Sequence, residues 1–130
     1  KNRLKYKLMR VSKFEKLLVW QKSTELALKV YRLYSNNQDF GFKNQIQRAS
    51  VSIANNIAEG FDRSSDKEFK RFLFIALGSA SEVRSMNYLA FKLKYITTEE
   101  YNDCNNQLIE ISKMLNGLSR SLNRIEVKYL

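Results

Sequence analysis

The feature that most constrains this chain is an unbroken row of apolar side chains near its C-terminal end. From residue 101 to residue 125 they recur at steps of three or four. The row consists of Tyr101, Cys104, Leu108, Ile111, Leu115, Leu118, Leu122 and Ile125. This spacing is typical of a helix packed along one seam of an antiparallel bundle. Thr97 with Glu100 three residues later is a capping-box pattern, which predicts where this helix begins.

Three earlier segments have the same helical spacing. The first, residues 15–35, carries a wide apolar face. The second, residues 42–59, has no charge between Arg48 and Glu59. That lack of charge predicts a central core helix, with one side against another subunit as the alternative. The third, residues 65–94, begins with a second capping-box pattern, Ser65 with Glu68.

Two glycines receive specific predictions. Gly60 is expected just past the end of the second helix, where glycine is favoured. Gly78 lies within the third helix among small residues, a grouping that predicts close approach to another helix.

The links between the segments are short, so neighbouring helices should run antiparallel. The chain contains no proline and four glycines, which favours long helices. We therefore predict an all-α fold, an antiparallel up-down-up-down four-helix bundle with short extended or disordered basic termini. The predicted divisions are a basic N-terminal tail over residues 1–13, the bundle over residues 14–125 and a C-terminal tail over residues 126–130.

The charge is concentrated at the two ends of the chain. The net charge is +10, but residues 17–116 contain thirteen basic and eleven acidic residues and are nearly neutral. Residues 1–16 contain seven Lys or Arg and one acid. Four of these cations precede Met9, so a start at Met9 would remove them. Basic ends favour a nucleic-acid partner, although such tails are often only solvated.

The short uncharged runs and the single cysteine predict a cytoplasmic protein that does not enter membranes. No uncharged run exceeds ten residues, whereas a membrane span needs about 20 apolar residues. The basic start has no following apolar region of the kind found in a secretory signal. A single cysteine, Cys104, cannot form an internal disulfide and is most simply a small core residue.

The residues needed for common catalysis are missing. The chain has no histidine, which removes Ser-His-Asp triads and the Glu-x-x-His metal sites of di-iron bundles. No phosphate-binding glycine loop is present, and no carboxylate cluster has the spacing of a metal site. We expect no catalytic residue, no metal and no cofactor.

Three isolated charges border or interrupt stretches of small residues: Arg48, Glu59 and Glu82. Buried charges need partners. We therefore predict a structural ion pair between Arg48 and Glu82 or Glu59, formed across helices or subunits. The alternative is that all three are simply exposed.

Three groups of cations are candidates for contact with nucleic acid. They are Arg3, Lys5, Lys7, Arg10 and Lys13 in the tail; Arg63, Lys67, Lys70 and Arg71; and Arg120, Arg124 and Lys128. The second and third groups follow helical spacing, so each would form one face. Tyr6 adds a stacking ring to the first group. Acids interleaved in the second group also fit an ordinary mixed surface.

Residues 45–61 (QIQRASVSIANNIAEGF) resemble the hallmark of the 23S rRNA intervening-sequence protein family. Residues 14–22, the segment from Phe72 to Glu82, and residues 113–118 agree with this family in the right order. A proline typical of the hallmark is replaced here by Ala54. The resemblance implies an up-down bundle and a homo-oligomer, with a pentamer as the favoured count. A more distant likeness is to the accessory protein of diversity-generating retroelements, which assembles with a reverse transcriptase and its RNA.

Two functions follow from these observations. The first is a non-catalytic oligomer that associates with nucleic acid (RNA or RNA–DNA, with RNA favoured over DNA) or with a ribonucleoprotein. The second is a protein-interaction scaffold that docks a polymerase, such as a reverse transcriptase, without binding nucleic acid itself. The nearly neutral body and the uncharged second helix favour this alternative.

Overall fold

The computed structural model describes residues 13–128, with side chains described through residue 122. A short 3-10 turn, η1 (Phe14–Lys16), precedes four helices. These are α2 (Leu18–Leu33), α3 (Phe40–Phe61), α4 (Asp66–Lys92) and α5 (Thr98–Lys128). Residues 13–128 contain no strand. The all-α four-helix bundle predicted from the sequence is confirmed.

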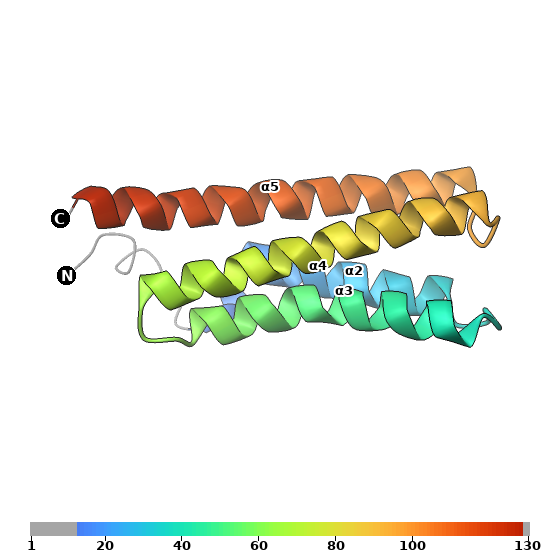
Figure 1. The fold of residues 1–130 in the computed structure, drawn as a ribbon, viewed down its shortest axis with the longest axis horizontal. Helices are drawn as coiled ribbons and strands as arrows, with labels where there is room; N and C mark the ends of the chain where they lie inside the picture. Colours follow the sequence, from blue (N-terminus) through green and yellow to red (C-terminus); the bar gives the residue numbers. More distant parts are fainter. Residues whose placement is uncertain (1–12, 129–130) are drawn as a thin grey trace.

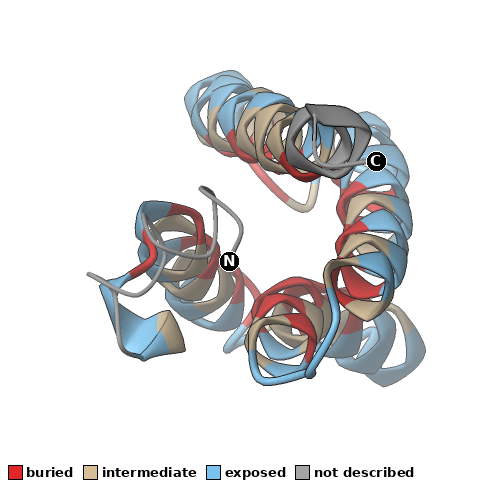
Figure 2. Cartoon of the chain, turned by 90° about the vertical axis from the view of Figure 1, so that its left-hand side faces the viewer, coloured by how far each residue is buried: buried red, intermediate tan, exposed pale blue. Residues whose placement is uncertain are grey.

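Successive helices run in opposite directions along the long axis (Figure 1). Viewed end-on, they surround a common core toward which their buried residues turn (Figure 2). The contact between α3 and α4 is the most extensive, and the contact between α2 and α5 is the least extensive of the helix pairs. Two ion pairs cross this last seam: Lys22 with Glu110 at 3.4 Å, and Lys29 with Asp103.

The core consists of the apolar rows seen in the sequence. In α5, Cys104, Leu108, Ile111, Leu115 and Leu122 are buried. The facing row of α4 contains smaller side chains, including Ala76, Ala80 and Ala90, each 0% exposed. Small residues on α4 opposite larger ones on its neighbours let the helices interlock without voids.

Helices α3, α4 and α5 each begin with a side-chain cap, whereas α2 has none. Asp39 accepts a hydrogen bond from the Phe42 amide at 3.2 Å, and Ser65 accepts one from the Glu68 amide at 3.2 Å. At α5 the capping box is reciprocal. The Glu100 amide donates to Thr97 Oγ1 at 3.1 Å, and the Thr97 amide donates to Glu100 Oε1 at 2.8 Å. These caps satisfy amides that have no partner within the helix.

Several sequence predictions need correction. Gly60 lies inside α3, which continues to Phe61, so it is not a residue past the helix end. A Cβ on Gly60 would lie 2.6 Å from Phe72 Cβ, so its role is close packing of α3 against α4. Gly78 faces open space instead of a neighbouring helix of the chain. Helix α5 continues through Lys128, so the predicted C-terminal tail begins within a helix.

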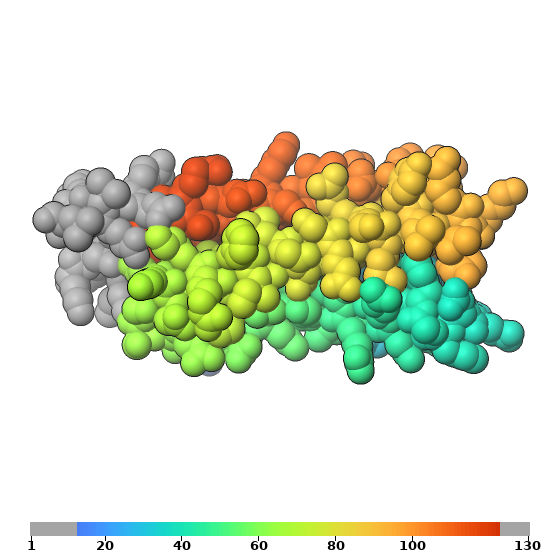
Figure 3. All heavy atoms as spheres, viewed as in Figure 1, coloured from blue at the N-terminus to red at the C-terminus, as the bar shows by residue number. Residues whose placement is uncertain are grey.

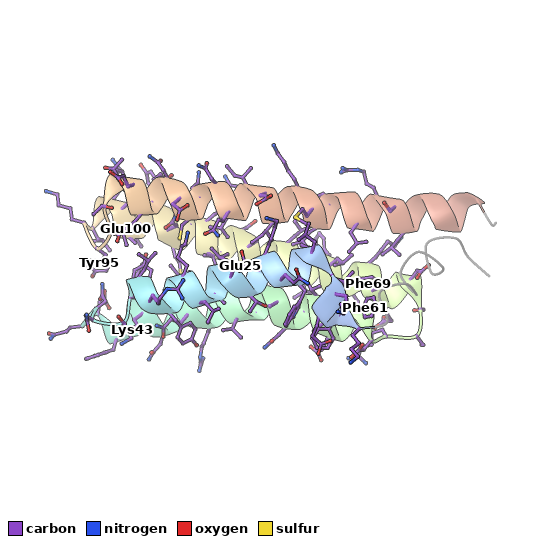
Figure 4. The ribbon with its side chains drawn as sticks, turned by 180° about the vertical axis from the view of Figure 1, so that it is seen from behind. Glu25, Lys43, Phe61, Phe69, Tyr95 and Glu100 are labelled. Carbon is purple, nitrogen blue, oxygen red and sulfur yellow. The ribbon has the colours of Figure 1, made fainter. Side chains whose placement is uncertain are left out.

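Aromatic residues close the end of the bundle where α2 meets α3 and α4 meets α5. Phe42 packs against Tyr34 and Tyr95, with ring centroids 5.8 and 5.4 Å apart. The Tyr95 hydroxyl donates to Asp39 Oδ2 at 2.6 Å, which joins the two connections. Tyr95 and Lys43 mark this end in Figure 4, and Phe61 and Phe69 mark the other.

Candidate nucleic-acid interface

The topology brings the predicted cationic groups toward one end of the bundle. Because the helices alternate in direction, α2 begins where α3 turns into α4 and where α5 ends (Figure 1). Lys13 is exposed just before η1 at this end. Arg63, Lys67, Lys70 and Arg71 surround the α3–α4 turn, and Arg120 lies in the part of α5 that approaches this end. Segments far apart in the sequence therefore place cations at the same end of the bundle.

Two arginines of this surface share an aromatic neighbour. The guanidinium carbons of Arg63 and Arg71 lie 4.8 and 4.7 Å from the centre of the Phe72 ring. Such cation–π contacts at exposed sites contribute about 0.5–1 kcal/mol. Phe72 is buried against Gly60, so the ring is a fixed platform under both guanidinium groups.

The same two arginines also contact carboxylates three or four residues earlier in the chain. Arg63 lies 3.7 Å from Glu59, and Arg71 makes two hydrogen bonds to Glu68 at 3.2 and 3.3 Å. The Arg71 hydrogen bonds hold the pKa of Glu68 below its usual value. Acidic and basic residues are equal in number over residues 59–71. This face is a mixed surface, as the interleaved acids indicated, in which the arginines are positioned but partly neutralised.

The structure describes the side chains of only some of the other cations predicted to contact nucleic acid. Lys67 and Arg120 are exposed, and Lys70 is half-buried. The tail residues Arg3, Lys5, Lys7 and Arg10 lie outside the described residues. Arg124 and Lys128 lie on the final turns of α5, beyond the described side chains.

The predicted ion pair of Arg48 is not formed within the described part of the chain. Glu59 pairs with Arg63 instead, and Glu82 accepts a hydrogen bond from Gln45 Nε2 at 3.3 Å. Arg48 and Glu82 line the same surface hollow between α3 and α4, and both are exposed. Within the chain this agrees with the alternative of simple exposure, and pairing across subunits stays a prediction.

The chain matches one protein family and resembles a solved structure. Residues 15–117 match the family described as 23S rRNA-intervening sequence protein. The chain belongs to that family. This intervening-sequence protein is also similar to a solved structure from Bacteroides thetaiotaomicron, described as a protein of unknown function from the S23 ribosomal protein family. The two share 35% identity and a TM-score of 0.74 over 78% of this chain and 98% of the other. No curated protein matches.

One hollow of this intervening-sequence protein was not singled out from the sequence. It lies between α4 and α5 and is lined by Ser81, Arg84, Ser85, Tyr88, Tyr101 and Asn105. A signal was present, because Arg84 and Tyr88 are four residues apart on the outward side of α4. The core row of this helix lies on its opposite side, and that row carries the stronger signal in the sequence.

The buried titratable groups of this family member lie in apolar surroundings typical of a protein core. Burial raises the pKa of the Cys104 thiol to about 11, which keeps it protonated and unreactive at neutral pH. Burial also raises the pKa of the Tyr34 phenol. Within the described residues, no three metal-binding side chains gather, and no helix has the length and apolar character needed to cross a membrane.

Proposed function

We propose that this protein is a non-catalytic, cofactor-free homo-oligomer of the cytoplasm that associates with nucleic acid, RNA rather than DNA. One observation carries the proposal. The fold gathers cations from η1, the α3–α4 turn and α5 at one end of the bundle, although they are distant in sequence. Contacts from cations to phosphates position a nucleic acid on a protein, and several segments can supply them together.

The existing ion pairs of this surface are compatible with binding to phosphate. Arg63 and Glu59 are about half exposed, at 47% and 60% of their side chains. Exposed pairs of this kind contribute about 0–1 kcal/mol. A phosphate oxygen can therefore replace the carboxylate at small cost. Phe72 would keep the guanidinium groups in place during the exchange.

Apolar side chains on the outside of α4 support self-association. Phe74 is 76% exposed, and Ile75 and Leu89 are also exposed on this helix. The exposed Gly78 lies between them and leaves space for a second helix to approach closely. A ring of subunits, with five as the favoured number, would cover this face and repeat the cationic end around a common axis.

The same apolar face favours the alternative function of a scaffold. A polymerase such as a reverse transcriptase, or a ribonucleoprotein, would then dock on α4 in place of a second copy. The two functions differ in one measurable property, because only the first requires the protein itself to bind nucleic acid.

The test measures binding of one single-stranded sequence, made as RNA and as DNA, between about 50 and 200 mM salt. The full chain is compared with a version that begins at Met9, and the mass of the assembly is recorded in parallel. We expect tighter binding to RNA and a steep loss of affinity with salt, because counterions are released from each neutralised phosphate.

Matched charge variants locate the surface. Lys67→Ala with Lys70→Ala removes two cations from the proposed end, and Arg32→Ala with Lys43→Ala removes two from the opposite end. We expect the first pair alone to weaken binding and to reduce the salt dependence. A stable assembly that binds neither RNA nor DNA would refute the proposal and favour the scaffold.

A further inference from the structure

The outer side of the α4–α5 seam contains two tyrosines beside two cations. Tyr88 is 51% exposed, and its ring centroid lies 6.3 Å from that of Tyr101 on α5. Lys92 Nζ lies 5.6 Å from the centre of the Tyr88 ring, and Arg84 lines the same hollow one helical turn earlier. Both helices are in view along this seam in Figure 3.

The floor of this hollow is fixed by contacts between α4 and α5. The Tyr101 ring stacks on Phe91 with centroids 4.9 Å apart. The buried Asn87 side chain donates to the Tyr101 carbonyl at 3.2 Å, which joins α4 to the first turn of α5. Tyr101 is therefore held in position, while Tyr88 projects further into solvent.

The charges around the hollow are sorted by side of the helix. Its six lining residues include one arginine and no carboxylate. Two acids of α5, Asp103 and Glu110, are turned to the other side of the helix, where they pair with lysines of α2. Glu82 of α4 accepts a hydrogen bond from Gln45 on α3. The hollow thus presents positive charge without a compensating acid on its walls.

The chemistry of the lining fits an unpaired nucleobase better than the surface of a protein partner. Only the two tyrosine rings provide apolar surface, and the remaining groups are two serine hydroxyls, an amide and a guanidinium. Aromatic rings stack on bases, amides bond to base edges, and cations contact phosphates. The volume of about 390 Å³ is within the range of small-molecule sites, about 300–1,000 Å³.

We propose that the hollow between Tyr88 and Tyr101 is a base-stacking site for single-stranded RNA. In this site Tyr88 stacks on a base, Asn105 bonds to the base edge, and Arg84 and Lys92 contact the adjoining phosphates. This inference rests on the proposed function, and it adds a second contact to the cationic end. At 1.5 Å per residue along α4, Tyr88 lies roughly 30 Å from Lys67, so one strand can reach both places.

The test uses the full chain and a single-stranded oligoribonucleotide of about 12 nucleotides that carries 2-aminopurine, whose fluorescence falls on stacking. Tyr88→Ala is compared with Tyr88→Phe and with Tyr31→Ala, a control at a tyrosine on α2 that is 46% exposed. We expect Tyr88→Ala to lose the quenching and about fivefold or more of the affinity. Its salt dependence should be unchanged because no charge is removed.

The controls separate this inference from the proposed function. Tyr88→Phe should keep the quenching, since it keeps the ring, and Tyr31→Ala should behave as the unaltered chain. An oligodeoxynucleotide of the same sequence tests whether the 2′-hydroxyl contributes. If the chain binds RNA but Tyr88→Ala and Tyr31→Ala are alike, or if Tyr88→Ala changes the assembly mass instead, only the stacking site is refuted. If the unaltered chain binds no RNA, both are refuted.

Discussion

Two residues show how closely this bundle is packed and where the packing leaves a cost. The Tyr34 side chain is 1% exposed, and its hydroxyl has no hydrogen-bond partner among the described residues. Gly60 leaves just enough space for Phe72 and Phe69 to approach the backbone of α3. The Tyr34 hydroxyl is thus buried without a partner, and the site of Gly60 has no room for a Cβ atom.

Tyr34→Phe is expected to raise the free energy of unfolding by about 0.5–1 kcal/mol. The buried hydroxyl gives up its hydrogen bonds to water and gains none in return, so its removal relieves a desolvation cost. Chemical denaturation of the purified variant measures the change. Tyr95→Phe is the control with the opposite sign, because its hydroxyl donates to Asp39. A Tyr34→Phe protein less stable than the unaltered chain would contradict this expectation.

Gly60→Ala is expected to lower the free energy of unfolding by about 1–3 kcal/mol, the usual cost of overpacking. The new Cβ would lie 2.6 Å from Phe72 Cβ, an atom fixed to the backbone of α4, so the helices must separate. Gly78→Ala is the matched control. Its Cβ meets open space, so in the separate subunit it should stabilise by about 0.5–1 kcal/mol through helix propensity. Equal effects of the two substitutions would argue against the close approach.

At the scale of the elements, the beginnings of α4 and α5 agree with their local sequence, whereas the end of α4 departs from it. The α4 helix ends in a Schellman motif, in which the Tyr95 amide donates to the Ala90 carbonyl at 2.9 Å and the Lys94 amide donates to that of Phe91 at 3.0 Å. This motif favours glycine at its left-handed position. Here Lys94 occupies that position with φ of 63°.

Lys94→Gly is therefore expected to raise the melting temperature, with a gain of about 0.5–1 kcal/mol. The left-handed conformation costs an L-residue about 1–2 kcal/mol, and the greater freedom of glycine in the unfolded chain offsets part of this gain. Lys92→Gly, at the last residue of α4, should instead destabilise by up to about 1 kcal/mol, the cost of glycine in a helix. Thermal unfolding of the two variants checks the contrast in sign.

At the scale of the whole molecule, Asp39 and Tyr95 join the α2–α3 connection to the α4–α5 connection. The Tyr95 hydrogen bond, followed by that from the Phe42 amide, holds the pKa of Asp39 below its usual value. A group with a lowered pKa in the folded state stabilises the protein above its unfolded pKa, about 3.9 for Asp. That contribution is lost as the pH falls through the folded pKa.

Asp39→Asn should flatten the loss of stability in acid. At neutral pH the variant is expected to be less stable than the unaltered chain, and the two should converge in acid as Asp39 becomes protonated. Melting temperatures from about pH 6 to about pH 2 measure the difference. Parallel curves over the whole range would show that this carboxylate does not contribute to acid unfolding.

Much of the fold could be predicted because it depends on local, periodic signals. The α5 row, the α4 row and the capping pairs at Ser65 and Thr97 are each visible within one segment, and the structure confirms them over the described side chains. The role of Gly60 depends on the distance between two helices, which no single segment specifies. The hollow at Tyr88 likewise requires knowing which side of α4 is left uncovered by α5. The interleaved acids were recognised, but which carboxylate each of Arg63 and Arg71 contacts depends on how the chain turns between α3 and α4.

The uneven contacts among the helices also have a kinetic consequence. The α2–α5 seam joins helices separated by the entire α3–α4 hairpin, whereas the other helix seams join neighbours in the chain. Closing this seam costs the most loop entropy and gains the least contact. It should therefore form after the folding barrier is crossed. Substitutions at Lys22 or Lys29 would then shorten the lifetime of the folded state and leave the rate of folding almost unchanged.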